Sequence, residues 1–348
     1  MKRFAAIVLT VTILMSMLYV PAIANKTGYL SGDFYDMVND KGEQHWAYDQ
    51  MTELIAMGIL TGYSETKTIY GERVQVQSAK PNQKITRAEF AAILYQALNL
   101  NGSNGDKAPF SDKIPSWAAE AVNALYKEGI IRGNPDGTFR PDRYISRAEI
   151  AAMLVNALND RSSQTGKSFP DVSSGHWASG SIGKASAMGI INGFPNGRFY
   201  PDRNAQRAEV MVMLYQYLLN DRSQAPADKT LISRAGKVSD AMESFISDDN
   251  YDSASVLQYL TGEMEVIMSD SEAGEIIREL KEEGFLGYSV TSPGRVVRKS
   301  DRLAEVAYDS TAVLRIDEIE LEVEMPIHYF LMKIGDEWYI YKENYETE

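Results

Sequence analysis

The chain has 348 residues, of which 44% are hydrophobic and 24% are charged, and it contains no cysteine. This composition is typical of a folded protein with two or three domains, and the absence of cysteine excludes disulfide bonds, thiol catalysis and cysteine-ligated metal sites. A formal net charge of −13 argues against nucleic acid as a partner, because phosphate binding needs clustered positive charge.

Residues 1–24 are predicted to be a secretory signal peptide. Lys2 and Arg3 precede an apolar stretch over residues 4–20, which is followed by the small-residue cleavage site Ala22-Ile23-Ala24. This cleavage site disfavours the alternative, a retained membrane helix. No later apolar run has the length that a bilayer span needs. We therefore expect a mature chain that begins at Asn25 and is exported to the cell wall or surface of a bacterium with a single membrane.

An internal repeat occupies residues 33–100, 108–160 and 168–220. The second and third copies align with an offset of 60 residues, and the first copy follows the same plan with eleven extra residues. We expect this insert, within residues 63–80, to form a longer hairpin or loop. A unit with two short helices cannot bury its apolar faces alone, so the three copies are expected to share one core. Each copy contributes a matching tryptophan and a matching glycine: Trp46, Trp117 and Trp177, and Gly62, Gly133 and Gly193.

Each copy is predicted to contain a helix near the tryptophan, a glycine that ends it, a turn, and a second, capped helix. The second helix begins at the signature Arg-Ala-Glu, whose arginines are Arg87, Arg147 and Arg207. Thr86 and Ser146 precede the signature with a glutamate three residues later, which predicts a capping box. The third copy has Gln206 at this position and lacks the hydroxyl, a loss of about 1 kcal/mol.

The signature arginine and the tryptophan each allow two interpretations. A cation in the first turn of a helix opposes the helix macrodipole, so its presence in three copies suggests a purpose. The arginine either forms an anion-binding site with the free N–H groups of the helix start, or pairs with a neighbouring carboxylate or aromatic ring. The tryptophan anchors its helix in the core, offers its face as a platform for a sugar ring, or does both.

A polar linker, residues 221–228, leads to a C-terminal domain over residues 229–348 that has a different charge. From Asp228 onward there are 12 basic and 27 acidic residues, whereas the region between the signal peptide and this point has 21 of each. Helical patterns cover residues 229–246, 251–268 and 272–283, and alternating patterns cover residues 287–299, 303–316, 319–334 and 338–343. We expect an α+β fold in which a curved antiparallel sheet, a long meander, wraps on the helices.

Short motifs recur in the three copies. They are Phe110-Ser111-Asp112 and Phe169-Pro170-Asp171, His45-Trp46-Ala47 and His176-Trp177-Ala178, Gly137-Thr138-Phe139-Arg140-Pro141, and the Arg-Ala-Glu signature. In this tandem arrangement they resemble the surface-layer homology (SLH) domain. The resemblance implies a multidomain protein whose α-rich repeats form a pseudo-three-fold spindle around a central helical bundle. It also implies binding of a pyruvylated secondary cell-wall polysaccharide.

The same resemblance implies a role for each repeated residue. The arginines would contact the carboxylate of the pyruvyl ketal, the tryptophans would line or support grooves between copies, and the loop glycines would present backbone groups to the sugar. The implied binding residues are Arg87, Arg147, Arg207, Trp46, Trp117, Trp177, Gly62, Gly133 and Gly193, with Asp36, Asp112 and Asp171 secondary or structural. The second copy is predicted to hold the most intact site, because the first lacks the Gly-x-Phe turn before its proline and the third lacks its hydroxyl cap.

The closing run over residues 327–340 resembles the last hairpin of NTF2-like (cystatin-like) domains, which bind small molecules, catalyse proton transfers, or do neither. His328 with a carboxylate such as Glu324 would be the acid–base pair of such a pocket, although a surface or core histidine is the simpler interpretation. The segment from Asp248 to Asp252 begins like a calcium loop but lacks the later glycine and glutamate, so a solvated loop is expected. We predict no catalytic residue, metal or cofactor.

Three functions follow from these patterns. The first is a non-enzymatic protein that is anchored non-covalently to the cell wall by its repeats and displays the acidic C-terminal domain. The second is a wall-tethered enzyme or small-molecule-binding protein with a pocket in that domain. The third is self-assembly into an S-layer lattice, against which the short C-terminal domain argues.

Overall fold

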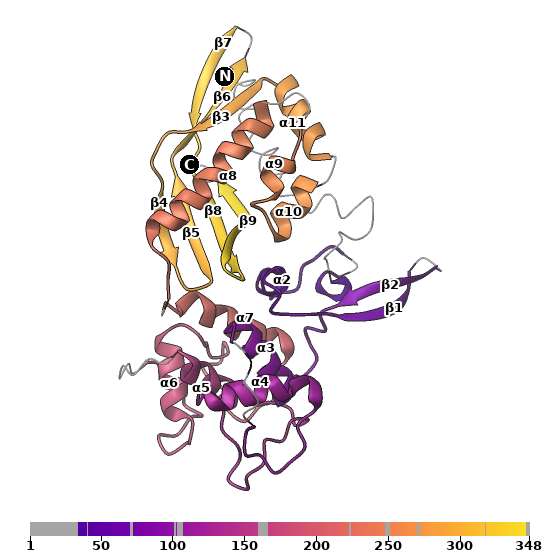
Figure 1. Ribbon diagram of the computed structural model, residues 1–348, viewed down its shortest axis with the longest axis vertical. Coiled ribbons are helices and arrows are strands. Elements are labelled where there is room, and N and C mark those ends of the chain that lie inside the picture. The colour runs from indigo at the N-terminus through magenta and orange to yellow at the C-terminus, as the bar shows by residue number, and fades with distance from the viewer. Residues whose placement is uncertain are drawn as a thin grey trace. The chain divides into compact units, whose positions relative to one another are not determined.

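The computed structural model describes residues 34–39, 41–69, 72–100, 102, 107–158, 166–222, 224–247, 251–269, 272–316 and 318–345. These residues form two compact units, the repeat unit up to residue 223 and the C-terminal domain from residue 224 onward (Figure 1). The predicted signal peptide lies outside the described residues. In the part of the chain that is described, no helix is long and apolar enough to cross a membrane.

The repeat unit consists of short helices and one hairpin. Its elements are η2 (Tyr35–Met37), α2 (Tyr48–Ala56), β1 (Tyr63–Ile69), β2 (Glu72–Ser78), α3 (Arg87–Ala97), α4 (Ser116–Lys127), α5 (Arg147–Ala157), α6 (Ser179–Ala187) and α7 (Arg207–Asn220). Strands β1 and β2 pair antiparallel, from Tyr63 opposite Ser78 to Ile69 opposite Glu72. The prediction that the insert of the first copy forms a hairpin is therefore confirmed.

The second helix of each copy begins with the expected capping chemistry. In α3 the Glu89 N–H donates to the Thr86 hydroxyl at 3.2 Å, and the Thr86 N–H donates to the Glu89 carboxylate at 2.7 Å. Helix α5 has the same capping box. At α7, Gln206 has no hydroxyl, but its N–H still donates to the Glu209 carboxylate at 3.0 Å. These bonds satisfy backbone donors that a helix start leaves unpaired.

A glycine in the left-handed conformation ends the first helix of every copy. Gly58, Gly129 and Gly189 have φ angles of 69°, 71° and 70°. A side chain at these positions would be strained, so glycine is favoured there. The stop signals predicted at these positions are confirmed.

The three copies close into a ring of contacts. Helix α3 contacts α4, α5 contacts α6, and α7 contacts α2, so each second helix packs on the first helix of the next copy. At the centre, the Ile145 N–H donates to the Ile85 carbonyl at 3.0 Å, the Ala205 N–H to the Ile145 carbonyl at 3.1 Å, and the Ile85 N–H to the Ala205 carbonyl at 3.4 Å. These three residues are fully buried. The copies therefore share one core, and removing one copy would leave buried backbone groups unpaired.

The C-terminal domain combines helices with two antiparallel sheets. Its elements are α8 (Asp228–Ser247), α9 (Ala254–Leu257), α10 (Gly262–Ser269), α11 (Glu272–Glu282), β3 (Phe285–Val290), β4 (Arg295–Lys299), β5 (Leu303–Tyr308), β6 (Ser310–Ile316), β7 (Ile319–Glu324), β8 (Ile327–Ile334) and β9 (Glu337–Tyr345). The strand orders are β3-β6-β7 and β4-β5-β8-β9. Helix α8 contacts β3, β4, β5, β8 and β9, so it packs across strands of both sheets (Figure 1).

Four predicted elements of this domain are each divided in two, and the prediction of a single meander is wrong. The stretches over residues 287–299, 303–316 and 319–334 each supply strands to both sheets, with breaks at Pro293, Asp309 and Pro326. A proline has no N–H to donate to a ladder, which explains two of these breaks. The stretch over residues 251–268 forms α9 and α10, because a parallel bridge between Leu260 and Ile340 ties the chain to β9 between them.

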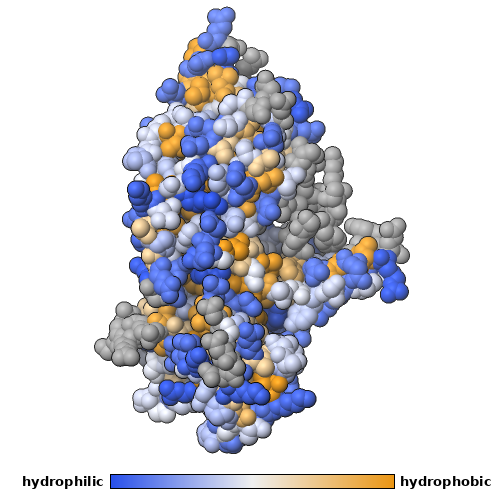
Figure 2. Space-filling model, viewed as in Figure 1, coloured by the Kyte–Doolittle hydropathy of each residue, from blue (hydrophilic) through white to orange (hydrophobic). Residues whose placement is uncertain are grey.

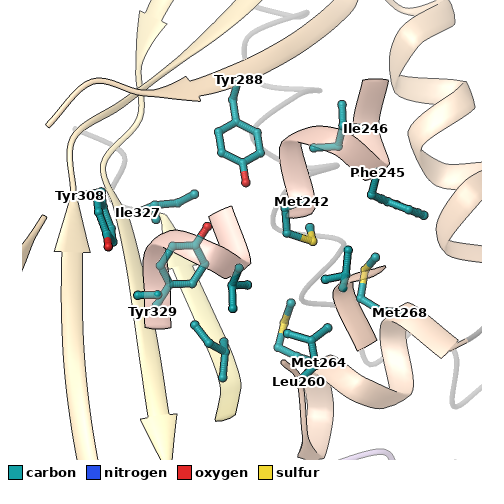
Figure 3. Packing of buried hydrophobic residues seen from close by; sticks show 14 of the residues in the cluster. Met242, Phe245, Ile246, Leu260, Met264, Met268, Tyr288, Tyr308, Ile327 and Tyr329 are labelled. Atoms are coloured by element: carbon teal, nitrogen blue, oxygen red, sulfur yellow. The ribbon is translucent and has the colours of Figure 1, made fainter. Parts of the chain in front are cut away.

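The core of the C-terminal domain lies between its helices and sheets and is mainly apolar. Phe285, Leu280 and Ile340 are fully buried within it. The hydroxyls of Tyr288 and Tyr329 point toward each other inside this core (Figure 3). Burial, with Tyr288 and Glu343 nearby, raises the pKa of Tyr329 well above its ordinary value of 10. Tyr329 is therefore neutral, as a buried phenol must be.

The outer surface of this domain is largely hydrophilic on the face seen in Figure 2. On β7, Glu320, Glu322 and Glu324 are exposed and alternate with half-buried residues. Alternation along the strand places these three carboxylates on one exposed face, which therefore has three negative charges.

Candidate functional site

A cleft of about 780 Å³ opens in the repeat unit beside the start of α5. All three copies contribute to its walls: Arg87 comes from the first copy, residues 130–135 and one side of α5 from the second, and Trp177 and Asp202 from the third. Its position between copies is the one expected of a groove that binds a polymer.

The walls of the cleft have a net positive charge. Its arginines are Arg87, Arg132, Arg140 and Arg143, and its carboxylates are Glu149 and Asp202. Met153 and Trp177 add apolar surface to the polar lining. A concave site with excess guanidinium groups and an exposed aromatic face is suited to a ligand that combines an anion with an apolar ring face.

Each signature arginine is buried and holds the backbone of the next copy. Its Nε donates to one carbonyl and its Nη2 to a second one. The Nε bonds run from Arg87 to Phe139 at 2.8 Å, from Arg147 to Phe199 at 2.8 Å, and from Arg207 to Ala79 at 3.0 Å. The Nη2 bonds run from Arg87 to Arg132 at 3.5 Å, from Arg147 to Asn192 at 3.1 Å, and from Arg207 to Thr61 at 3.4 Å. The three arginines are only 3–5% exposed.

The guanidinium groups also have charged or aromatic neighbours. Arg87 forms an ion pair with Glu149 of the second copy at 2.5 Å, and Arg147 lies 3.8 Å from Glu209 of the third. Arg207 instead lies over the ring of Tyr63, 4.9 Å from its centroid. The rings of Phe139 and Phe199 lie below Arg87 and Arg147, at 4.7 and 4.6 Å. The interpretation of the signature arginine as a partner of carboxylates and rings is confirmed, and its contact with a ligand stays a prediction.

Burial governs the electrostatics of this cluster. Burial lowers the pKa of Arg147 to about 10, against the opposing effect of Glu209. The pKa of Arg87 is lowered by burial as well. For Glu149, burial raises the pKa, but Arg87, the Ser146 N–H and Arg143 outweigh it, so the pKa lies below 4.5. At neutral pH both Arg147 and Glu149 are therefore ionised.

The tryptophans lie outside the core. Trp46, Trp117 and Trp177 are 60%, 59% and 65% exposed, so the interpretation as core anchors is wrong. Each occupies the loop or first turn at the start of its helix, and more than half of its surface is open to solvent. Trp177 lines the cleft, whereas Trp46 and Trp117 are not among the residues of its walls.

The loop glycines allow a close approach of a phenylalanine. A Cβ on Gly62, Gly133 or Gly193 would lie 1.8, 2.8 or 2.7 Å from a ring carbon of Phe34, Phe110 or Phe169. These distances are too short for two non-bonded carbon atoms, so a side chain at any of these positions would displace the ring. The glycines therefore have a packing role in all three copies. Gly133 also lines the cleft, while ligand contact by any of the three stays a prediction.

The secondary aspartates have a structural role. Asp112 accepts from the N–H groups of Phe139 and Arg140, at 2.8 and 2.6 Å, and Asp36 and Asp171 make the same pair of bonds in their copies. Arg140 has a φ of 58°, so the carboxylate holds a strained turn. This turn supplies the carbonyl that Arg87 binds.

Three histidines were considered from the sequence. His45 and His176 each accept a local turn hydrogen bond from the N–H two residues later, at 3.3 and 3.2 Å. His328 pairs with Glu305 on the neighbouring strand at 2.7 Å, so the pairing proposed with Glu324 is wrong. Glu305 also binds Arg298, at 2.8 Å. Among the described residues no cluster of histidine and carboxylate side chains is placed to hold a metal ion, and Asp248 and Asn250 lie outside that set.

Several residues that line the cleft or contact the buried arginines and their glutamates were not predicted from the sequence. Arg143 and Arg203 lie 60 residues apart and bind Glu149 and Glu209, the latter at 2.7 Å, so the repeat alignment held a signal for them. Arg132 has no counterpart in the other copies, and only its place on the cleft wall reveals it. Tyr63 takes part because the hairpin of the first copy brings its ring to Arg207.

The repeat unit is similar in sequence to parts of known cell-surface proteins. Residues 109–151 and 168–211 match the model of the S-layer homology domain family. Cell surface glycoprotein 1 of Acetivibrio thermocellus is 35% identical over 155 residues, which are 40% of this chain and 7% of that protein. The cellulosome-anchoring protein of the same organism is 33% identical over 148 residues, 40% of this chain and 33% of that protein. S-layer protein EA1 of Bacillus anthracis is 27% identical over 201 residues, 56% of this chain and 22% of that protein.

The chain thus spans a third or less of each of these relatives. Among solved structures, the intermembrane space region of chloroplast protein ARC6 covers 35% of this chain and 98% of its own, at 13% identity and a TM-score of 0.27. A similarity of that level supports no conclusion on the fold, so the NTF2-like resemblance of the C-terminal domain stays a prediction.

Proposed function

We propose, on the premise that this chain is an S-layer homology domain protein, that its repeat unit anchors it non-covalently to the wall of a bacterial cell. The ligand in this proposal is a secondary cell-wall polysaccharide that has pyruvyl ketals on its sugars. The repeat unit would act as the anchor and the C-terminal domain would be displayed at the surface.

The observation that supports this proposal is the cleft between copies. It has four arginines against two carboxylates, and Trp177 on its wall is 65% exposed. A pyruvylated sugar presents a carboxylate on one side and a C–H face on another. Guanidinium groups form charge-assisted bonds with carboxylates, and an indole face packs well on the C–H face of a sugar.

The ring of contacts between copies supports a spindle with three grooves. In this proposal the signature arginines Arg87, Arg147 and Arg207, the tryptophans Trp46, Trp117 and Trp177, and the glycines Gly62, Gly133 and Gly193 line or support these grooves. The groove at the second copy is the main site, since it is the cleft described above.

The C-terminal domain is suited to display rather than to wall contact. Its residues from Asp228 onward have a net charge of −15, and they are repelled by an anionic polymer within about a Debye length, roughly 8–10 Å. The proposal assigns no reaction to this domain.

Cosedimentation of the mature chain with purified cell walls tests the proposal. We expect the chain to pellet with native walls and to stay in solution after mild acid has removed the ketal-linked pyruvate. Trp177→Ala should weaken binding about fivefold or more, because the loss of a buried aromatic contact is worth more than about 1 kcal/mol. Ile319→Ala, which removes a side chain 63% exposed on the C-terminal domain, serves as the matched control.

Two results would contradict the proposal. One is a wild-type chain that stays in solution with native walls. The other is equal binding to walls with and without pyruvate, which would leave the charge of the cleft without a ligand.

A further inference from the structure

The four arginines of the cleft differ in how many internal partners they have. All three donor groups of Arg87 are used, by the Phe139 and Arg132 carbonyls and by Glu149. Arg143 binds Glu149 as well, and Arg140 binds Asp136 at 2.6 Å. These three guanidinium groups therefore bind groups of the protein itself, which leaves fewer of their N–H donors for a ligand.

Arg132 is different. It is exposed on the cleft wall, and within the described ranges its guanidinium makes no hydrogen bond or ion pair. Among the described residues no carboxylate pairs with it, whereas Arg87, Arg140 and Arg143 each have such a partner.

The backbone of Arg132 is nevertheless held in place. Its carbonyl accepts from Arg87 Nη2 at 3.5 Å. The preceding Ile131 is buried, and the following Gly133 is closed in by Phe110. A fixed backbone with a free guanidinium is the arrangement expected of a residue that meets a ligand, because little backbone entropy is lost on binding.

The other two copies have no cation at this position. Asn192 and Thr61 take the place of Arg132, and their carbonyls bind Arg147 and Arg207 in the same way. The backbone geometry is thus common to the three copies, while the charge belongs to the second copy alone.

We propose that Arg132 is the residue that selects an acidic sugar in this cleft, by pairing directly with the carboxylate of the ligand. Arg87 is then a positioning residue, which holds the loop of Arg132 and neutralises Glu149. The copy with Arg132 binds the acidic form of the polymer more tightly than the copies with Asn192 or Thr61. This inference rests on the proposed function and adds the residue and the copy that determine its specificity.

Binding of the mature chain to purified wall polysaccharide, before and after mild acid removal of pyruvate, tests this assignment. Arg132→Asn gives the second copy the residue of the third. We expect this variant to bind the pyruvylated polymer roughly tenfold more weakly, the loss expected for one charge-assisted hydrogen bond, and to bind the pyruvate-free polymer unchanged. Arg132→Lys, which keeps the charge, should retain part of the preference.

Asn192→Arg in the Arg132→Asn background is the reciprocal variant. It should restore part of the lost affinity for the pyruvylated polymer, because it places a guanidinium on the equivalent loop. Thermal unfolding of each variant should match the wild type, since the Arg132 side chain is exposed and bonds to nothing in the described chain.

The outcomes separate the two proposals. If the wild type prefers the pyruvylated polymer and Arg132→Asn keeps the same preference, the assignment of Arg132 is overturned while wall anchoring stands. If the wild type binds neither polymer, both proposals fail.

Discussion

The repeat unit joins its modules through buried arginines, whereas the C-terminal domain packs its helices and sheets around one apolar core. In the repeat unit, Arg87, Arg147 and Arg207 each bind two carbonyls of the next copy. In the C-terminal domain, α8 contributes apolar side chains such as Leu231 and Phe245 that pack against the sheets. The contacts between copies of the repeat unit thus depend on directional hydrogen bonds, whereas the packing of helices on sheets in the C-terminal domain depends on buried apolar area.

This difference follows from what each region has to specify. Three similar copies present similar apolar faces, so burial alone does not distinguish the correct neighbour or register. A guanidinium that must reach two carbonyls and a carboxylate is satisfied in one arrangement only. The C-terminal domain has no internal repeat, and the shapes of its different elements suffice to specify their packing.

The largest effect is expected from a cavity in the C-terminal core. Phe285 is fully buried, and Phe285→Ala should lower the free energy of unfolding of this domain by about 3–5 kcal/mol. Denaturant unfolding of the full chain measures the loss of unfolding free energy. Amide hydrogen exchange then shows which of the two regions has lost it. A matching loss in the repeat unit would show that the two regions unfold together and would contradict the difference described here between their cores.

A smaller loss, in the repeat unit only, is expected from Arg87→Ala. The substitution leaves Glu149 and the carbonyls of Phe139 and Arg132 with fewer donors, which should reduce the free energy of unfolding of the repeat unit by about 3 kcal/mol. The same unfolding experiment measures it. Arg87→Lys is the control: it keeps the charge but not the fork of donors, so it should rescue only part of the loss. Full rescue by lysine would mean that charge alone matters.

The smallest effect is a pH dependence of the repeat unit. The pKa of Glu149 lies below 4.5 in the folded chain, so its carboxylate stabilises the fold above about pH 4.5, and this contribution is lost as the pH falls through the folded pKa. Glu149→Gln should therefore flatten the slope of the unfolding free energy against pH below pH 4.5. The slope should decrease without vanishing, because the pKa of Asp171 is also lowered, by bonds from the Phe199 and Tyr200 N–H groups that outweigh its burial. An unchanged slope in urea titrations at several pH values would contradict the role given to Glu149.

Local features of the fold could be predicted because their causes are local. The capping boxes at Thr86 and Ser146 and the helix ends at Gly58, Gly129 and Gly189 depend on residues within a few positions of one another. The hairpin of the insert joins two adjacent strands, from Tyr63 opposite Ser78 to Ile69 opposite Glu72. The exposed glutamates of β7 follow from simple alternation along one strand. The two-sheet topology could not be predicted in this way, because pairing of β3 with β6 joins residues far apart in the chain.

The candidate site likewise has features that follow from local sequence and features that depend on contacts between distant residues. Residue spacing alone indicates three copies of one module, the start and end of their helices, and an arginine at the start of each second helix. The surroundings of the site residues come from the tertiary structure: Arg87 is buried against the next copy, Arg132 lies exposed on the cleft wall with no partner among the described residues, and Trp177 is exposed to solvent. Those outcomes depend on which carbonyls and carboxylates of a distant copy come within reach, and sequence spacing within one copy holds no information about that distance.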